Sequence, residues 1–250
     1  MNDEFPKLSE LMNSIEHEKI KDSIFHDFEK SIKENPQRKA AFLAIEHELQ
    51  KISGDDWGDF KEKSVSLLFR LENDRGYEKF SNIVNEVRAF NYLNESLNCS
   101  NVKFIPTANS KETPDLVAEL DSKVLLCEVK TINPSDVEIE RRKITKGGSF
   151  VFGATQNKLS AEFFAKLQKT FEKAKSQILQ YAGDRSTRNI IFTVINFDDL
   201  FSEYKEEYYS QIDGYLQSHP MPNFEFVFFN QKTAFYKNIR MKSAVVVNES

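Results

Sequence analysis

The chain has 250 residues, of which 40% are hydrophobic and 29% are charged, and its formal net charge is -5. This composition is typical of a globular protein with a sizeable core, and it excludes the disordered and fibrous classes. No apolar run approaches the roughly 18 residues that a membrane-spanning helix needs. The first residues are acidic, unlike those of a signal peptide. We therefore expect a cytoplasmic protein without a membrane partner.

The first part of the chain is predicted to be helical. Between residues 5 and 71, apolar side chains such as Ile45 and Leu49 recur three or four positions apart. Gly54 and Gly58 follow this pattern and are predicted to interrupt it. We expect a helical N-terminal extension, residues 1–78.

The rest of the chain alternates between helical and strand-like patterns. A helix is predicted over residues 79–97. Short apolar runs bounded by turn residues then predict strands, and longer amphipathic stretches predict helices. In chain order these are strands at 102–105, 116–120 and 124–132, a helix at 159–182, a strand at 189–197, a helix at 200–216, and strands at 224–229 and 244–247. This order predicts an α/β or α+β domain over residues 79–250.

Charge is distributed unevenly along the chain. Residues 141–188 contain eleven Lys and Arg against three Asp and Glu, whereas the first eighty residues contain 13 basic and 18 acidic side chains. A polyanion such as nucleic acid is therefore expected to meet the basic segment, including Arg141, Arg142 and Lys143. For any one lysine, a solvated helix face is an equal alternative.

Two neighbouring strands carry carboxylates that the predicted register brings together. A two-residue turn at Asp121-Ser122 makes a hairpin in which Asp115 lies opposite Glu128. Directly opposed side chains lie on one side of a sheet, with Cβ atoms about 4.5 to 5.5 Å apart. Like charges so placed repel, so a shared proton, a nearby cation or a bound metal must compensate. Lys130 projects from the same face.

A third carboxylate lies on a helical stripe that is otherwise apolar. Glu86 is in the middle of this stripe, and burial of an unpaired charge costs several kcal/mol or forces protonation. A structural pair with one lysine or arginine, or a side chain that reaches solvent, is the alternative to a role in a site. The stripe consists of Ile83, Val87, Phe90, Leu93 and Leu97.

Together these residues resemble the motif of a known family. The pattern is Glu86 on a helix, Pro114-Asp115 opening one strand, and Glu128-Val129-Lys130 on the next strand. It resembles the core motif of the PD-(D/E)XK nuclease superfamily, whose restriction-endonuclease-like fold is a mixed sheet flanked by helices. D/E-x-K occurs at three other places in the chain, but only this copy lies within an apolar strand. The resemblance covers residues 79–197.

A further match lies on the long helix after the second motif strand. Gln177 and Tyr181 form Q-x-x-x-Y, which resembles the extra motif of the branch of this superfamily found in DNA-end-processing recombination nucleases. Gln211 and Tyr215 have the same spacing, and position along the chain favours the first pair. The first pair borders lysines on the helix surface, so an amide and a phenol there are expected to touch a phosphate backbone. Ordinary helix-edge residues are the alternative.

The resemblance implies a metal-dependent nuclease that hydrolyses phosphodiester bonds, with DNA as the expected substrate. It implies Mg²⁺, for which Mn²⁺ can substitute, held by Asp115, Glu128 and the Val129 carbonyl, with Glu86 helping to hold the ion or its water. Lys130 would orient or help deprotonate the attacking water.

Two other functions stay open at this point. One is a protein of the same fold that binds nucleic acid without cutting it. The other is a structural or interaction protein in which the charged residues form an ion cluster on a solvent-facing sheet. The N-terminal section is open to three roles, which are homo-oligomerisation, docking of a protein partner and substrate selection.

Overall fold

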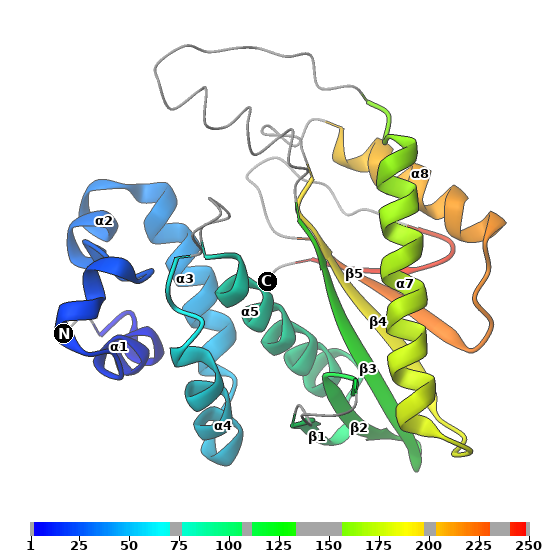
Figure 1. Cartoon of the computed structure of the whole chain (residues 1–250), viewed down its shortest axis with the longest axis horizontal. Helices are drawn as coiled ribbons and strands as arrows, with labels where there is room; N and C mark the ends of the chain where they lie inside the picture. Colours follow the sequence, from blue (N-terminus) through cyan, green and yellow to red (C-terminus); the bar gives the residue numbers. More distant parts are fainter. Residues whose placement is uncertain are drawn as a thin grey trace. The chain divides into compact units, whose positions relative to one another are not determined.

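The computed structural model describes residues 3–70, 77–106, 112–133, 157–197, 204–230 and 241–248. The chain forms two compact units, Met1–Asn98 and Cys99–Ser250. In the described residues the first unit consists of helices, and the second combines a sheet with helices (Figure 1).

Phenylalanine rings form a large part of the core of the first unit. Phe28 packs edge-on against Phe5, Phe25 and Phe42, with ring centroids 4.8 to 5.7 Å apart. The helical pattern predicted for residues 5–71 is confirmed over the described residues. The helices of this unit are α1 (Pro6–Asn13), η1 (His17–Asp22), α2 (Phe28–Glu34), α3 (Pro36–Gln50), α4 (Gly54–Val65), α5 (Glu78–Asn91) and the short π-helix η2 (Tyr92–Ser96).

One detail of the helical prediction is wrong. α4 runs from Gly54 to Val65, so Gly58 does not interrupt a helix. The rings of Trp57 and Phe60 are buried and stack with centroids 5.7 Å apart. Packing of this face offsets the roughly 1 kcal/mol that glycine costs inside a helix. The helix does break before Gly54, as predicted, because α3 ends at Gln50 and α4 begins at Gly54, which has a φ of +58°.

The second unit is built on a six-stranded mixed sheet, which confirms the α/β class. The strands follow chain order across the sheet, with β1, β2 and β3 antiparallel and β3 to β6 parallel. Helices connect β3 to β4 and β4 to β5. The elements are β1 (Ser100–Phe104), β2 (Leu116–Leu120), β3 (Lys123–Ile132), α7 (Ala161–Ala182), β4 (Arg188–Ile195), α8 (Lys205–Ser218), β5 (Phe224–Asn230) and β6 (Val245–Asn248).

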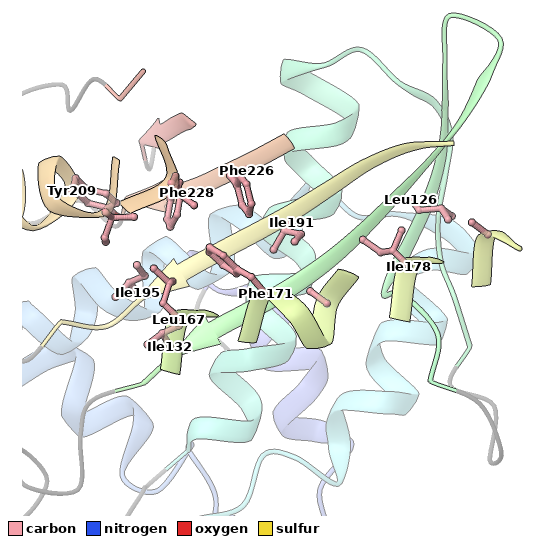
Figure 2. Packing of buried hydrophobic residues seen from close by; sticks show 14 residues of the cluster. Leu126, Ile132, Leu167, Phe171, Ile178, Ile191, Ile195, Tyr209, Phe226 and Phe228 are labelled. Atoms are coloured by element: carbon pink, nitrogen blue, oxygen red, sulfur yellow. The ribbon is translucent and has the colours of Figure 1, made fainter. Parts of the chain in front are cut away.

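Both connecting helices pack on one face of the sheet. Parallel crossovers are right-handed, so two successive ones place their helices on the same side. Figure 2 shows the resulting core, in which Phe171 of α7 and Tyr209 of α8 lie among side chains of β3, β4 and β5. The sheet contributes alternate residues to this core, namely Leu126, Ile132, Ile191, Ile195, Phe226 and Phe228.

The predicted register of the β2–β3 hairpin is confirmed. Val117 pairs with Leu126 and Glu119 pairs with Val124. The turn residues Asp121 and Ser122 both have positive φ, of 50° and 62°, as a type I′ two-residue turn requires. The even-numbered residues of β3 therefore face α7.

Some predicted features lie outside the described residues. Arg141, Arg142 and Lys143 are among these, as is most of the long connection between β3 and α7. In the described segments, no helix has the length and apolar character needed to cross a membrane.

Candidate active site

Asp115 lies immediately before β2 and connects three strands of the sheet. Its backbone carbonyl accepts a hydrogen bond from the N–H of Ile105, just after β1, at 2.9 Å. Its carboxylate Oδ2 accepts a hydrogen bond from the N–H of Val129 on β3 at 2.8 Å. The carboxylate is therefore held against the backbone of the Glu128-Val129-Lys130 motif. The predicted register had placed Asp115 opposite Glu128, which is the residue before Val129.

Pro114 explains why the strand pairing stops at this point. The N–H of Val129 points toward β2, and in an antiparallel pair the carbonyl of the same residue points to the same side. If the β2–β3 register continued, residue 114 would lie opposite Val129. Because proline has no N–H, it cannot donate a hydrogen bond to the Val129 carbonyl. The proline thus leaves this carbonyl beside Asp115 without a donor from β2.

Glu128 is a buried carboxyl group in an unusual environment. Its exposed fraction is 2%, and its Oε2 atom makes no hydrogen bond to any described residue. Burial, followed by the negative charge of Asp115, raises the pKa of Glu128 to about 8, although Lys130 acts in the opposite direction. Such a carboxyl group exchanges a proton near neutral pH and is poised to accept a cation in place of that proton.

Lys130 is held by two acceptors that come from different elements. Its Nζ donates to Glu128 Oε1 at 2.5 Å and to Gln177 Oε1 on α7 at 2.8 Å. Gln177 in turn donates from Nε2 to the Thr113 carbonyl at 3.4 Å, directly before Pro114. One glutamine thus links the lysine to the segment that carries the aspartate.

The two Q-x-x-x-Y pairs have different surroundings. Gln177 is nearly buried and contacts Lys130, whereas Gln211 bonds to the backbone of Asn157 and Leu159 and fixes the chain before α7. Tyr181 is half-buried against the α7 core, and the Arg185 guanidinium lies over its ring at 5.3 Å. Among the described contacts, Gln177 is therefore joined to the motif and Tyr181 is not.

Glu86 lies on α5, in the first compact unit. Ile83, Val87 and Phe90 around it are buried, as the helical stripe predicted. Its carboxylate forms an ion pair with Lys63 of α4, with Nζ and Oε2 2.7 Å apart. This is the kind of structural pair that the sequence left open, and a role of Glu86 in the site stays a prediction.

Lysines of α7 border the site on its outer side. Lys173 pairs with Glu112 at 3.1 Å, close to Pro114 in the chain, and Lys166 donates to the carbonyl of Asn133 after β3 at 3.0 Å. Both are exposed, as is Lys169. These three lysines of the basic segment therefore lie on the helix that carries Gln177.

Sequence reasoning missed two features of the site. One is the link from Gln177 to the Thr113 carbonyl, since a backbone acceptor leaves no signal in the side-chain pattern. The other is Thr193 on β4, whose Cα partner on β3 is Lys130. Neighbouring parallel strands put paired residues on one face, so a polar residue in the apolar run 190–195 was the available signal.

In comparisons with known proteins, no family model, no curated protein and no solved structure matches this chain. Within the described segments there is also no group of three or more His, Cys, Asp or Glu side chains that could hold a metal ion. The candidate site is therefore defined by its own geometry, which is two carboxyl groups, a lysine, a glutamine and a strand carbonyl.

Proposed function

We propose that the protein is a metal-dependent nuclease of the PD-(D/E)XK type that hydrolyses phosphodiester bonds in nucleic acid, with DNA as the expected substrate. The observation that carries this proposal is the convergence of Asp115, Glu128, Lys130 and Gln177 at one point of the sheet. They come from the start of β2, from β3 and from α7, so folding rather than proximity in the chain brings them together.

The residues present fit a hard divalent cation. Mg²⁺ prefers carboxylate and carbonyl oxygens together with water. The carboxylates of Asp115 and Glu128 and the Val129 carbonyl are such donors, and the buried Oε2 of Glu128 makes no hydrogen bond to a described residue. When bound, the ion would neutralise charge on the attacked phosphate and sharpen a water nucleophile.

Lys130 has a separate role in this proposal. Its ammonium lies beside Glu128 and is oriented by Gln177, so its positive charge is placed to stabilise an attacking hydroxide or an oxygen that gains charge. Gln177 acts through Lys130 in this arrangement. It is therefore a positioning residue, rather than the direct phosphate contact expected from the helix-edge pattern.

Burial distinguishes this proposal from a surface ion cluster. A cluster on a solvent-facing sheet would expose its carboxylates, whereas Glu128 is 2% exposed beneath α7. A buried carboxyl group with a raised pKa in an otherwise apolar sheet destabilises the fold, since replacing such groups with apolar residues is often neutral or stabilising. A functional role explains why these residues occupy such a position.

The proposal is tested by incubating the purified protein with linear DNA, circular DNA and RNA. Each substrate is offered with Mg²⁺, with Mn²⁺ and with a chelator. We expect cleavage in Mg²⁺ and in Mn²⁺ and none in chelator, and cutting of circular DNA would identify an endonuclease. Retarded migration of nucleic acid without cleavage in either metal would instead favour a binding protein on the same fold.

A further inference from the structure

Thr193 is a polar residue in the most apolar part of the sheet. It lies in the middle of β4, and its exposed fraction is 0%. Its neighbours on the same strand face, Ile191 and Ile195, belong to the core beneath α7, as does its partner on β5, Phe228. Valine would fill the same space without a hydroxyl group. Packing alone therefore does not explain why a threonine occupies this position.

The hydroxyl group of Thr193 is without a partner among the described residues. Its Oγ1 atom is buried and makes no hydrogen bond there. Leaving a hydroxyl group unpaired in an apolar environment is unfavourable, and buried polar atoms in folded proteins nearly always find an acceptor or a donor. A small movement that brings the Thr193 hydroxyl group within hydrogen-bond distance of a donor would therefore lower the free energy of the folded protein.

Lys130 provides a candidate donor on the neighbouring strand. Lys130 and Thr193 are Cα partners in the parallel β3–β4 pair, so their side chains leave the same face of strands about 5 Å apart. A lysine ammonium has three N–H donors. Within the described residues two of these are used, by Glu128 and by Gln177. An unused donor and an unpaired acceptor thus lie on adjacent strands.

We infer that Thr193 is a positioning residue that accepts the third hydrogen bond of the Lys130 ammonium. With Glu128 and Gln177 it fixes the direction of the ammonium, and Thr193 approaches it from β4, on the side of β3 that faces away from β2. The inferred hydrogen bond needs no metal and forms by a small movement of these side chains from their positions in the structure. Its consequence for cleavage rests on the proposed nuclease function.

The test compares Thr193→Val, which removes the hydroxyl group at nearly constant shape, with Thr193→Ser, which keeps it. The first readout is the NMR signal of the Lys130 ζ-ammonium in chelator, assigned by its loss in Lys130→Arg. We expect Thr193→Val to shift this signal and to speed its hydrogen exchange by about tenfold, the effect of losing one hydrogen bond to a charged group. Thr193→Ser should restore the wild-type signal.

Thr187→Val is the matched control. It removes a hydroxyl group that donates to Asn189 at 2.8 Å near the start of β4, away from Lys130. We expect this control to leave the Lys130 signal unchanged. Thr193→Ala provides a second hydroxyl-free variant if Thr193→Val does not fold.

Two results would overturn the inference. The first is a Lys130 signal that is the same in wild type, Thr193→Val and Thr193→Ala. The second is a higher stability of Thr193→Val than of wild type. Removing a hydroxyl group that makes no hydrogen bond from an apolar core is stabilising, whereas removing a hydrogen-bonded hydroxyl group is not.

Cleavage provides an independent readout. In Mg²⁺ we expect Thr193→Val to lower kcat by about tenfold with KM unchanged, and Thr193→Ser to recover most of the rate. A wild-type protein that cuts no nucleic acid would overturn the proposed function. The NMR signal of Lys130 would still show whether Thr193 accepts a hydrogen bond from Lys130.

Discussion

Glu128 is the residue on which the chemistry of the site depends. Its environment favours the protonated form, because the group is buried and Asp115 lies beside it. The sequence predicted the pairing of these two carboxyl groups from strand alternation and a two-residue turn. It could not predict the size of the effect, since burial of Glu128 depends on α7, which is distant in the chain.

The raised pKa makes stability depend on pH in a defined direction. The folded-state pKa of about 8 lies above the ordinary value of 4.5, so the cost of holding an ionised Glu128 in the fold is absent below pH 4.5 and grows as pH rises to 8. In chelator, we expect the free energy of unfolding to fall with a slope of up to about 1.4 kcal/mol per pH unit in this window. Glu128→Gln should flatten this slope.

Urea unfolding of wild type and of this variant at several pH values between 5 and 8 measures the effect. Glu119→Gln is the control, because Glu119 is an exposed β2 carboxylate bonded to Asn101. Identical slopes for Glu128→Gln and wild type would mean that Glu128 is not protonated in the folded protein.

Lys130 should affect the chemical step and not the capture of metal. Lys130→Ala removes a positive charge 2.5 Å from Glu128 Oε1, so the affinity for Mn²⁺ should be retained or increased. Its cleavage rate should fall strongly. Calorimetry measures the first effect and single-turnover cleavage measures the second, and loss of Mn²⁺ binding would argue against this division of roles.

The elements that position these residues follow different physical rules, and these rules decide what the sequence could predict. The strands around the motif were predicted within two residues, because alternating burial and turn residues are local signals. The interruption at Gly58 was predicted wrongly, because burial of Trp57 and Phe60 and the hydrogen bond from the Trp57 indole to Glu10 maintain α4. The contact between Gln177 and Lys130 required the crossover of α7 onto the sheet, which no local pattern contains.

Pro114 lies where the β2–β3 pairing stops. Pro114→Ala restores an N–H that can donate to the Val129 carbonyl and lengthen the β2–β3 pair by one hydrogen bond. We expect the free energy of unfolding to stay unchanged or to rise by about 1 kcal/mol. The affinity for Mg²⁺ and the cleavage rate should both fall. Unchanged metal affinity in a stably folded variant would show that this carbonyl is not a ligand.

The two glutamines of the Q-x-x-x-Y pairs are a natural comparison. Gln177→Ala should slow cleavage without weakening binding of nucleic acid, because it releases Lys130 on one side. Gln211→Ala should leave the cleavage rate unchanged and lower the stability of the fold, because it removes the hydrogen bonds that hold the chain before α7. Steady-state cleavage and thermal unfolding distinguish the two outcomes, and the reverse pattern would assign the motif to the second pair.

The distribution of charge along the chain predicts where the proposed nucleic-acid substrate binds. The first compact unit carries 14 basic and 20 acidic side chains, whereas residues 141–188 carry a large positive excess. Neutralising Arg141, Arg142 and Lys143 together should weaken binding and flatten its salt dependence by about one unit of slope per lost phosphate contact. Fluorescence anisotropy at several salt concentrations measures the affinity and its salt dependence. An unchanged slope would mean that nucleic acid binds to another part of the protein.

Asp115 and Glu128 are proposed to form the metal-dependent centre of a nuclease. The most direct measurement is the rate of DNA cleavage in Mg²⁺ by wild type, Asp115→Asn, Glu128→Gln and the control Glu119→Gln, all purified in the same way. Loss of an outer group near a metal slows catalysis up to about 100-fold, so loss of either carboxylate should slow it by more than that, while the control keeps the wild-type rate. Cleavage at the wild-type rate by either site variant would contradict the assignment.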